Sequence, residues 1–194
     1  GMLVGHNTLR LMVMGMEDRA PTRPELDTMI GLLEQGLRAG ALGMSSGLFT
    51  PPGSYAVADE MVAFGHVLKS HNAGYFTHLR DESDKVIEAV QEAIDIAETC
   101  GIHVEIVHFK CSGTNNWGKA ATALDMIAAA KARALALPGA LFGVAFLCAL
   151  AAVTALAVGV VLALAKLIGQ LLGGLLGLLI FAAIAAGLGW YGAE

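Results

Sequence analysis

The chain has 194 residues, with 12 Lys and Arg, 17 Asp and Glu and a formal net charge of −5, so its composition argues against nucleic-acid binding. Every charged residue except Lys166 and Glu194 lies at or before Arg133, and the remainder is mostly Ala, Leu, Gly and Val. The three cysteines lack paired or zinc-ribbon spacing, which argues against a disulfide framework. Two unlike parts follow: a mildly acidic α/β segment, 1–133, and a hydrophobic helical segment, 134–194.

The opening residues predict the end of a strand at Leu3 and Val4, then a turn at His6. They lack the basic and apolar regions of a signal peptide, and we expect the chain to open inside a fold. A helix is predicted to start at Thr22 or Arg23, just before a proline, and to end at Gly40. Its apolar stripe consists of Leu26, Met29, Ile30, Leu33 and Leu37.

A short buried strand is predicted to end near Ser45 and Ser46, and a Pro- and Gly-rich loop follows it. The next predicted helix runs from about Val57 to Ser70. Beyond it, the stretch from Gly74 to Cys111 predicts strand, helix, strand.

In that stretch His78 closes the first predicted strand and His108 closes the second. Apolar residues at helical spacing mark the connecting helix, which Ser83 or Asp84 would cap and Gly101 would end. A right-handed crossover makes the two strands parallel, so both histidines should emerge at the carboxyl edge of the sheet.

Strand and helix alternate roughly every thirty residues, which predicts an α/β fold with parallel strands. A closed eight-stranded barrel typically needs about 250 residues. We therefore expect an arc of a TIM-like (β/α) barrel over 1–133.

The hydrophobic part begins after a helix predicted from about Lys119 to Arg133, which Pro138 and Gly139 should break. The two apolar segments that follow, 140–165 and 167–190, each exceed the roughly 20 residues needed to cross a bilayer as a helix. This pattern predicts a transmembrane hairpin or one long hydrophobic helix, with membrane contact through 140–190. Glycines at 169, 173 and 177 would permit close helix packing.

Two histidines at the ends of neighbouring parallel strands are suited to hold a divalent metal, because rigid strands fix the ligands while loops supply a pocket. Neutral imidazole favours zinc. The alternative is that each histidine only forms a hydrogen bond at a strand end. His6 is predicted to form a structural hydrogen bond in a turn, and His66, His71 and His103 to lie on the surface or against helices.

Four strings, LVGHNTLR, GALGMSSGLFTPPGSYA, THLRDES and VHFKCSG, resemble the N-acyl-D-amino-acid deacylases (D-aminoacylases) of the amidohydrolase superfamily. The resemblance runs from about Met2 to Arg133. It implies a zinc-dependent TIM-like barrel that cleaves the amide bond of an N-acyl-D-amino acid with metal-activated water.

The resemblance also implies roles for individual residues. His78 and His108 match zinc ligands, and Lys110 matches a lysine that helps to hold the carboxylate of the small-molecule substrate. Arg80, together with Asp81 and Glu82, would orient the ligands from behind them, unless this polar loop is merely solvated and caps the helix. Ser46 would line the substrate pocket, unless its small size only allows tight packing.

The departures from the family pattern concern the same site. An amino-terminal His-x-His pair, a bridging cysteine and a late catalytic aspartate have no counterpart in this sequence, and Cys111 stands in the wrong place for the bridge. Because catalytic zinc sites use about three protein ligands and this ligand set is incomplete, we expect the chain by itself to hold no zinc tightly and to be an inactive barrel fragment.

Two other interpretations concern the hydrophobic part. A non-enzymatic membrane-anchored scaffold or binding module would use it as an anchor, and Lys131 and Arg133 would favour a cytoplasmic location for 1–133. Alternatively, a reading-frame shift, a gene fusion or an artificial extension replaced the family sequence near Arg133. Reading the coding DNA across 132–138 separates these two.

Overall fold

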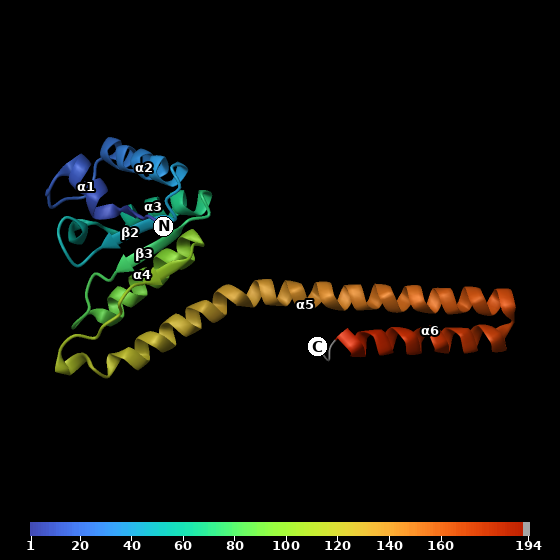
Figure 1. Ribbon diagram of the computed structural model, residues 1–194. Coiled ribbons are helices and arrows are strands. Elements are labelled where there is room, and N and C mark those ends of the chain that lie inside the picture. The colour runs from blue at the N-terminus through green and yellow to red at the C-terminus, as the bar shows by residue number, and fades with distance from the viewer. Residues whose placement is uncertain (192–194) are drawn as a thin grey trace. The chain divides into compact units, whose positions relative to one another are not determined.

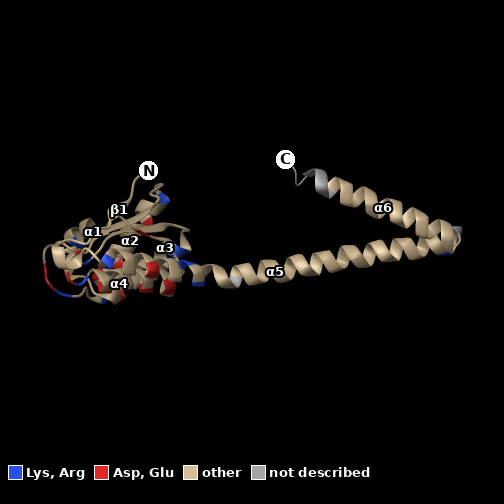
Figure 2. Cartoon of the chain, turned by 90° about the horizontal axis from the view of Figure 1, so that it is seen from below, with Lys and Arg blue, Asp and Glu red and all other residues tan. Residues whose placement is uncertain are grey.

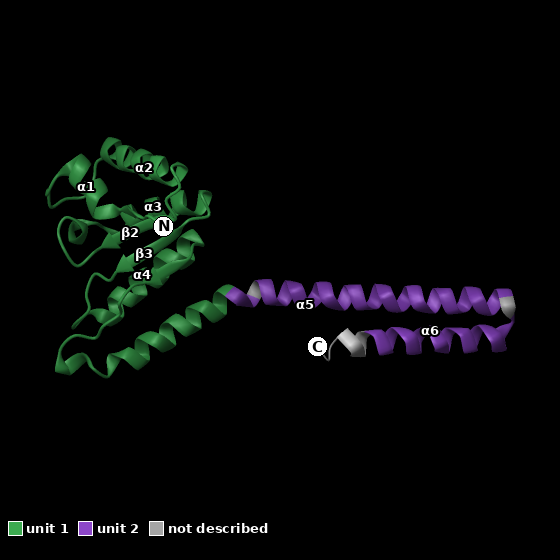
Figure 3. Ribbon diagram, viewed as in Figure 1, with its two compact units in different colours: residues 1–134 green, residues 135–194 purple. Residues whose placement is uncertain are grey.

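The computed structural model describes residues 1–191, without the side chains at 137, 168 and 188–191. The chain divides into two units, Gly1–Ala134 and Leu135–Glu194 (Figure 3). Within the described part of unit 2 only Lys166 is charged, whereas unit 1 carries acidic and basic side chains over its helices and loops (Figure 2).

Unit 1 is built on a parallel sheet whose strands lie side by side in chain order (Figure 1). The strands are β1 (Val4–Gly5), β2 (Gly43–Gly47), β3 (Gly74–His78) and β4 (Val104–Ile106). The helices of unit 1 are α1 (His6–Met14), α2 (Arg23–Arg38), α3 (Ala58–Ser70) and α4 (Val86–Cys100), with short 3₁₀ turns η1 (Gly53–Tyr55) and η2 (Thr114–Asn116). Helix α5 (Lys119–Ile168) begins in unit 1, and α6 (Gln170–Tyr191) lies in unit 2. The parallel α/β class is confirmed.

The two faces of the sheet differ because side chains alternate along each strand. Ser46 is paired in register with Thr77, and both are buried toward the helices, whereas Phe76 and His78 alternate to the other, half-buried face. The core between sheet and helices includes Met29, Leu33, Met44, Met61, Phe64, Leu68, Tyr75 and Ile96. Chemistry at the strand ends can therefore proceed on the half-buried face without disturbing the core.

Helix α2 illustrates how local signals set an element. Thr22 and Glu25 form a capping box at its start, and a proline occupies its first turn. The buried residues, Met29, Leu33 and Leu37, come from the predicted stripe. The start and the buried face of this helix agree with the sequence prediction.

Two predicted boundaries near the histidines were wrong. Strand β4 ends at Ile106, so His108 lies in the turn beyond it, with a φ of 39° that few residues other than glycine adopt. Helix α4 starts after Lys85 rather than at Ser83 or Asp84, and the Asp81 carboxylate accepts the backbone N–H groups of Ser83 and Lys85. Both corrections reflect loop geometry that periodicity does not encode.

The predicted break at Pro138 was also wrong, because α5 continues through it to Ile168. Proline removes one helical hydrogen bond, but Ala and Leu, the strongest helix formers, precede it and resume directly after Gly139. The chain turns instead at Gly169, whose φ of 88° suits glycine.

Within unit 2, α6 packs against the second half of α5. A Cβ atom added to Gly173 would lie 2.2 Å from the Cα of Ala165, and one added to Gly177 would lie 2.6 Å from a Val161 methyl group. Both glycines are buried, while most neighbouring apolar side chains are exposed. By length and composition only, α5 and α6 qualify as candidate membrane spans.

Candidate metal and substrate site

The two histidines singled out in the sequence meet at the carboxyl edge of the sheet. Nδ1 of His78 lies 3.1 Å from Nε2 of His108, with ring centroids 4.6 Å apart. His78 is held by β3, whereas His108 is held by its left-handed turn after Val107, whose N–H donates to the Thr77 carbonyl. The structure thus brings together the two predicted ligands.

Glu82 joins this pair as a candidate ligand, whereas the sequence analysis placed it behind the ligands. Its side chain is 8% exposed, and its two carboxylate oxygens lie 3.8 Å from His78 Nε2 and 3.4 Å from His108 Nδ1. Ligand atoms from His78, Glu82 and His108 all lie within 4.8 Å of one another, so these three residues could hold a metal ion. The available signal was the spacing of four residues between His78 and Glu82.

Lys110 lies directly beside this group. Its Nζ is 2.6 Å from Glu82 Oε2 and 3.0 Å from His108 Nδ1, and it also donates to the His108 carbonyl at 3.2 Å. About half of the lysine side chain is exposed. A primary ammonium therefore sits between the ligands and solvent.

The charge state of His78 suits metal binding. Burial lowers the pKa of this imidazole, Glu82 partly offsets the effect, and the nearby His108 and Lys110 lower the pKa further. A lowered pKa keeps His78 neutral near pH 7, which is the form that coordinates a metal.

A loop from the neighbouring strand forms one side of the site. The Phe49 ring lies 5.7 Å from the His78 ring, centroid to centroid. Asn7 holds this loop, since its Oδ1 accepts from Gly47 N at 3.0 Å and its Nδ2 donates to the carbonyls of Gly47 and Thr50. The first turn of α1 thereby fixes the position of the loop that carries Phe49 beside His78.

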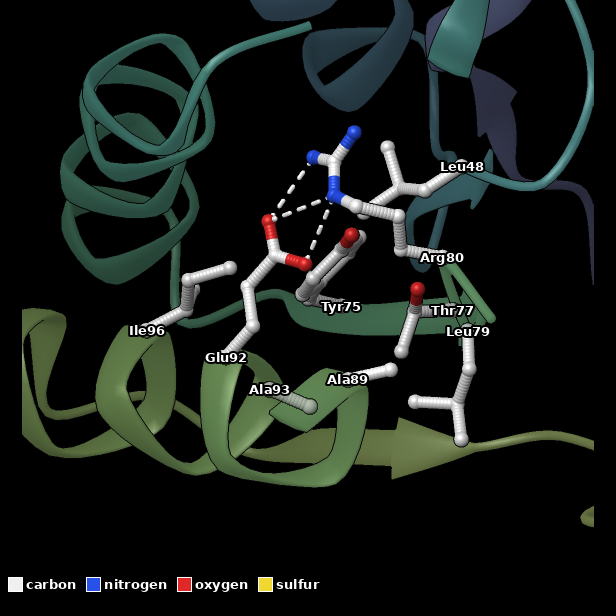
Figure 4. Close-up of a pocket in the computed structure, with 9 residues that line it drawn as sticks. All are labelled: Leu48, Tyr75, Thr77, Leu79, Arg80, Ala89, Glu92, Ala93 and Ile96. Atoms are coloured by element: carbon white, nitrogen blue, oxygen red, sulfur yellow. Dashed lines mark hydrogen bonds and ion pairs between the residues drawn. The ribbon is translucent and has the colours of Figure 1, made fainter. Parts of the chain in front are cut away.

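Arg80 occupies a different position from the histidines. Its guanidinium makes bidentate contacts with Glu92 on α4, the shortest at 2.8 Å (Figure 4). It also donates to the carbonyls of Ser54 and Ala56. These bonds raise the pKa of Arg80, with the Glu92 hydrogen bond as the largest cause. Within the described residues Arg80 makes no hydrogen bond to His78, Glu82 or His108, so any influence on them passes through the loop and α4.

Ser46 is not brought to the histidine pair either. Its hydroxyl lies 2.6 Å from the Tyr75 hydroxyl and 3.1 Å from that of Thr77, on the helix-covered face of the sheet. Burial raises the pKa of Tyr75, which keeps this phenol protonated. Strand alternation thus gives Ser46 a packing position, on the face opposite to His78.

The remaining histidines lie outside the site. His6 bonds to Glu60 at 2.8 Å in a buried cluster with Arg10, a structural hydrogen bond of the kind its turn position suggests. His103 is exposed and lies 3.5 Å from Glu105. His66 and His71 belong to α3 and its carboxyl end, and neither is among the residues near the candidate metal group.

Comparison with known proteins places this geometry in a family. No family model matches the chain. Residues over two thirds of the chain are 43% identical to an N-acyl-D-aspartate deacylase and 37% identical to a D-aminoacylase, both from Alcaligenes xylosoxydans xylosoxydans. The matches cover 67% and 68% of this chain but 26% and 27% of those proteins, so the chain spans about a quarter of their length.

Solved structures agree with the sequence relatives. An N-acyl-D-glutamate deacylase from Bordetella bronchiseptica, in complex with zinc and a phosphonate inhibitor, has a TM-score of 0.66 at 36% identity, over 68% of this chain and 28% of that one. A D-aminoacylase described as defining a subset of amidohydrolases has a TM-score of 0.65 at 36% identity, over 67% and 27%. The matching two thirds of this chain therefore belong to the D-aminoacylase family of amidohydrolases.

Proposed function

We propose that unit 1 provides part of a zinc-dependent site for hydrolysing the amide bond of N-acyl-D-amino acids. The main support for this proposal is that His78, Glu82 and His108 lie together at the carboxyl edge of a parallel sheet. In α/β barrels the active site lies at this edge. His78 and His108 are the proposed zinc ligands. The family relationship favours this function over a non-enzymatic scaffold.

The residues present fit a divalent cation. Glu82 Oε1 is buried and has no hydrogen-bond partner among the residues that the structure describes, which leaves acceptor capacity facing the histidines. Two neutral imidazoles and a carboxylate form a donor set found in catalytic zinc sites. When bound, the metal supplies Lewis-acid activation of water and of the scissile carbonyl.

The other roles fall to side chains around the metal group. Lys110 supplies the cation for the substrate carboxylate, and Phe49 limits the space beside His78. Arg80 supports the site indirectly, through the loop at 54–56 and α4. Ser46 contributes by ordering β2 against β3 rather than by reaching the substrate.

The sequence predicted that the chain alone holds no zinc tightly, but the Glu82 carboxylate beside the two histidines supports metal binding by the chain alone. No turnover is expected, because the sequence has no counterpart of the family's His-x-His pair or late aspartate. The test is zinc titration by calorimetry of the full chain in mild detergent, with an assay for hydrolysis of N-acetyl-D-amino acids. We expect binding that is lost in His78→Ala and His108→Ala, and no hydrolysis above background.

Two results would contradict this assignment in different ways. A folded chain whose zinc binding is unaffected by either histidine substitution would refute the metal site. Turnover that disappears in His78→Ala would refute the inactivity and show a site more complete than proposed.

For the hydrophobic helices we propose insertion into a bilayer through 140–190, with 1–133 on the cytoplasmic side. The favouring observation is the close contact at Gly173 and Gly177, which leaves apolar side chains on the outside of the hairpin. Membrane fractionation tests this, and recovery in the soluble fraction would be incompatible with a spanning hairpin.

A further inference from the structure

We propose that Glu82 is a third ligand of the metal and that the Lys110 ammonium occupies this carboxylate until a divalent cation displaces it. The inference rests on the proposed metal site and deepens it. The two residues have linked roles. Glu82 binds the metal, and the metal releases Lys110 from Glu82.

The Lys110 ammonium lies against two of the three candidate ligands. Lys110 Nζ lies 2.6 Å from Glu82 Oε2 and 3.0 Å from His108 Nδ1. These two atoms belong to two of the three candidate metal ligands, and their lone pairs are the ones that a metal would use. A divalent cation bound to the same donors would bring positive charge next to this ammonium. The lysine and the metal therefore compete for one set of lone pairs.

The Glu82 carboxylate is buried, and the lysine satisfies only one of its two oxygens. Glu82 is 8% exposed, and an ionised carboxylate at such burial needs a compensating charge. Lys110 supplies one positive charge to Oε2, while Oε1 has no hydrogen-bond partner within the described part of the chain. A carboxylate has about four lone-pair sites, so Glu82 is only partly satisfied by the lysine.

A purely structural ion pair would not require this arrangement. Oε1 points toward His108 Nδ1 at 3.4 Å, which is too long for a good hydrogen bond but suits two ligands around a common ion. Metal–oxygen and metal–nitrogen distances near 2 Å place such donors about 3 Å apart. The three side chains are thus close to the spacing that a bound ion imposes.

Lys110 links metal binding to substrate binding. The Lys110 side chain is about half exposed and on a flexible stem, so displacement from Glu82 leaves its ammonium free to turn outward. The freed charge would then be available to the carboxylate of an N-acyl amino acid. Metal binding and recognition of an anionic substrate are coupled through this one lysine.

The experiment measures zinc affinity of the full chain in mild detergent, by calorimetry, for Glu82→Gln and Lys110→Met. The matched controls are Glu88→Gln and Lys85→Met, which make the same charge changes at exposed positions outside the site. We expect Glu82→Gln to weaken zinc binding by about tenfold or more. We expect Lys110→Met to strengthen it by about fivefold, because a competing cation is removed.

A second readout identifies the ligand directly. Co²⁺ in place of zinc should give a visible absorption spectrum that changes in Glu82→Gln and is unchanged in Lys110→Met. The proposal is overturned if Glu82→Gln binds zinc as tightly as Glu88→Gln, or if Lys110→Met binds no more tightly than Lys85→Met. If Glu82→Gln does not fold, the lysine pair of variants decides the matter.

The outcome separates this inference from the proposed function. Zinc binding that depends on His78 and His108 but not on Glu82 or Lys110 refutes the linked roles and preserves the histidine site. Zinc binding that depends on none of these residues refutes both.

Discussion

Arg10 Nη1 and Glu60 Oε2 are 2.5 Å apart where neither side chain is exposed by more than 1%, and His6 binds the other oxygen of the same carboxylate. This cluster joins α1 to α3. Removing the carboxylate charge leaves Arg10 buried without a counterion, so Glu60→Gln should lower the free energy of unfolding by about 3 kcal/mol or more.

Pulse proteolysis of the full chain across a urea gradient measures this change in the α/β unit. Glu88→Gln, an exposed position on α4, should stay within about 0.5 kcal/mol of the wild type. Equal effects of the two substitutions would show that the buried pair contributes no more than a surface charge.

Gly43 permits the close pairing of β2 and β3. A Cβ atom at this position would lie 2.0 Å from the Gly74 carbonyl oxygen, so Gly43→Ala forces the strands apart and should destabilise the protein by about 2 kcal/mol. Gly31 on α2 has open space around a Cβ atom, and Gly31→Ala should stabilise by up to about 1 kcal/mol. The same urea assay compares them, and destabilisation by both would contradict the steric argument.

The acid dependence of stability includes a contribution from Glu25. Hydrogen bonds from Arg19, and then from Thr22, hold the pKa of this carboxyl well below its usual range. A lowered pKa contributes stability that is present above the ordinary carboxyl value of about 4.3 and is lost as the pH falls below it. Calorimetric melting should therefore show Glu25→Gln below the wild type at pH 7, with the difference shrinking toward pH 3.

The ion pair between Glu25 and Arg19 is partly exposed, with 23% and 39% of the two side chains accessible, so its contribution to stability should also weaken in high salt. Glu88→Gln again serves as the control, because the structure gives Glu88 no ion-pair partner among the described residues. A Glu25→Gln difference that is constant from pH 7 to pH 3 would refute the assigned cause.

The sequence was most informative where structure depends on neighbours along the chain. The stripe and cap of α2 and the end of β3 at His78 follow from periodicity and cap chemistry, and the family strings identified the two histidines. It was least informative where distant segments meet. His6 and Glu60 are 54 residues apart in the chain, and no sequence pattern around either residue predicts their contact.

The site shows the same division. Whether Ser45 or Ser46 faces the helices depends on the register with β3, and His108 reaches His78 through a left-handed turn that a bulky residue rarely adopts. The sequence shows Glu82 four positions after His78, but it does not show that the Glu82 side chain is buried beside the histidines, because tertiary packing determines that burial. Pro138 is the opposite case, where a strong local rule gave the wrong helix end.

Cysteine reactivity should follow burial. Burial raises the pKa of the Cys100 thiol on α4, and both effects slow alkylation, because the thiolate is the reactive form. Cys111 is only partly buried, in the loop beyond His108. Maleimide labelling in mild detergent at pH 7.5 should modify Cys111 well before Cys100, as read by peptide mass spectrometry, and early labelling of Cys100 would show that α4 is loosely packed.

The contact between α5 and α6 can be tested by cross-linking. A side chain at Gly173 would touch Ala165, whereas one at Gly174 would meet nothing within 4 Å. In a background with the three native cysteines replaced by serine, Ala165→Cys with Gly173→Cys should form a disulfide on mild oxidation, after a small shift of the helices to reach disulfide spacing. Ala165→Cys with Gly174→Cys is the matched control, because position 174 points away from the partner helix. Faster migration on a non-reducing gel, reversed by reductant, reports the bond. Equal cross-linking of both pairs would mean that the helices do not hold the register set by the glycines.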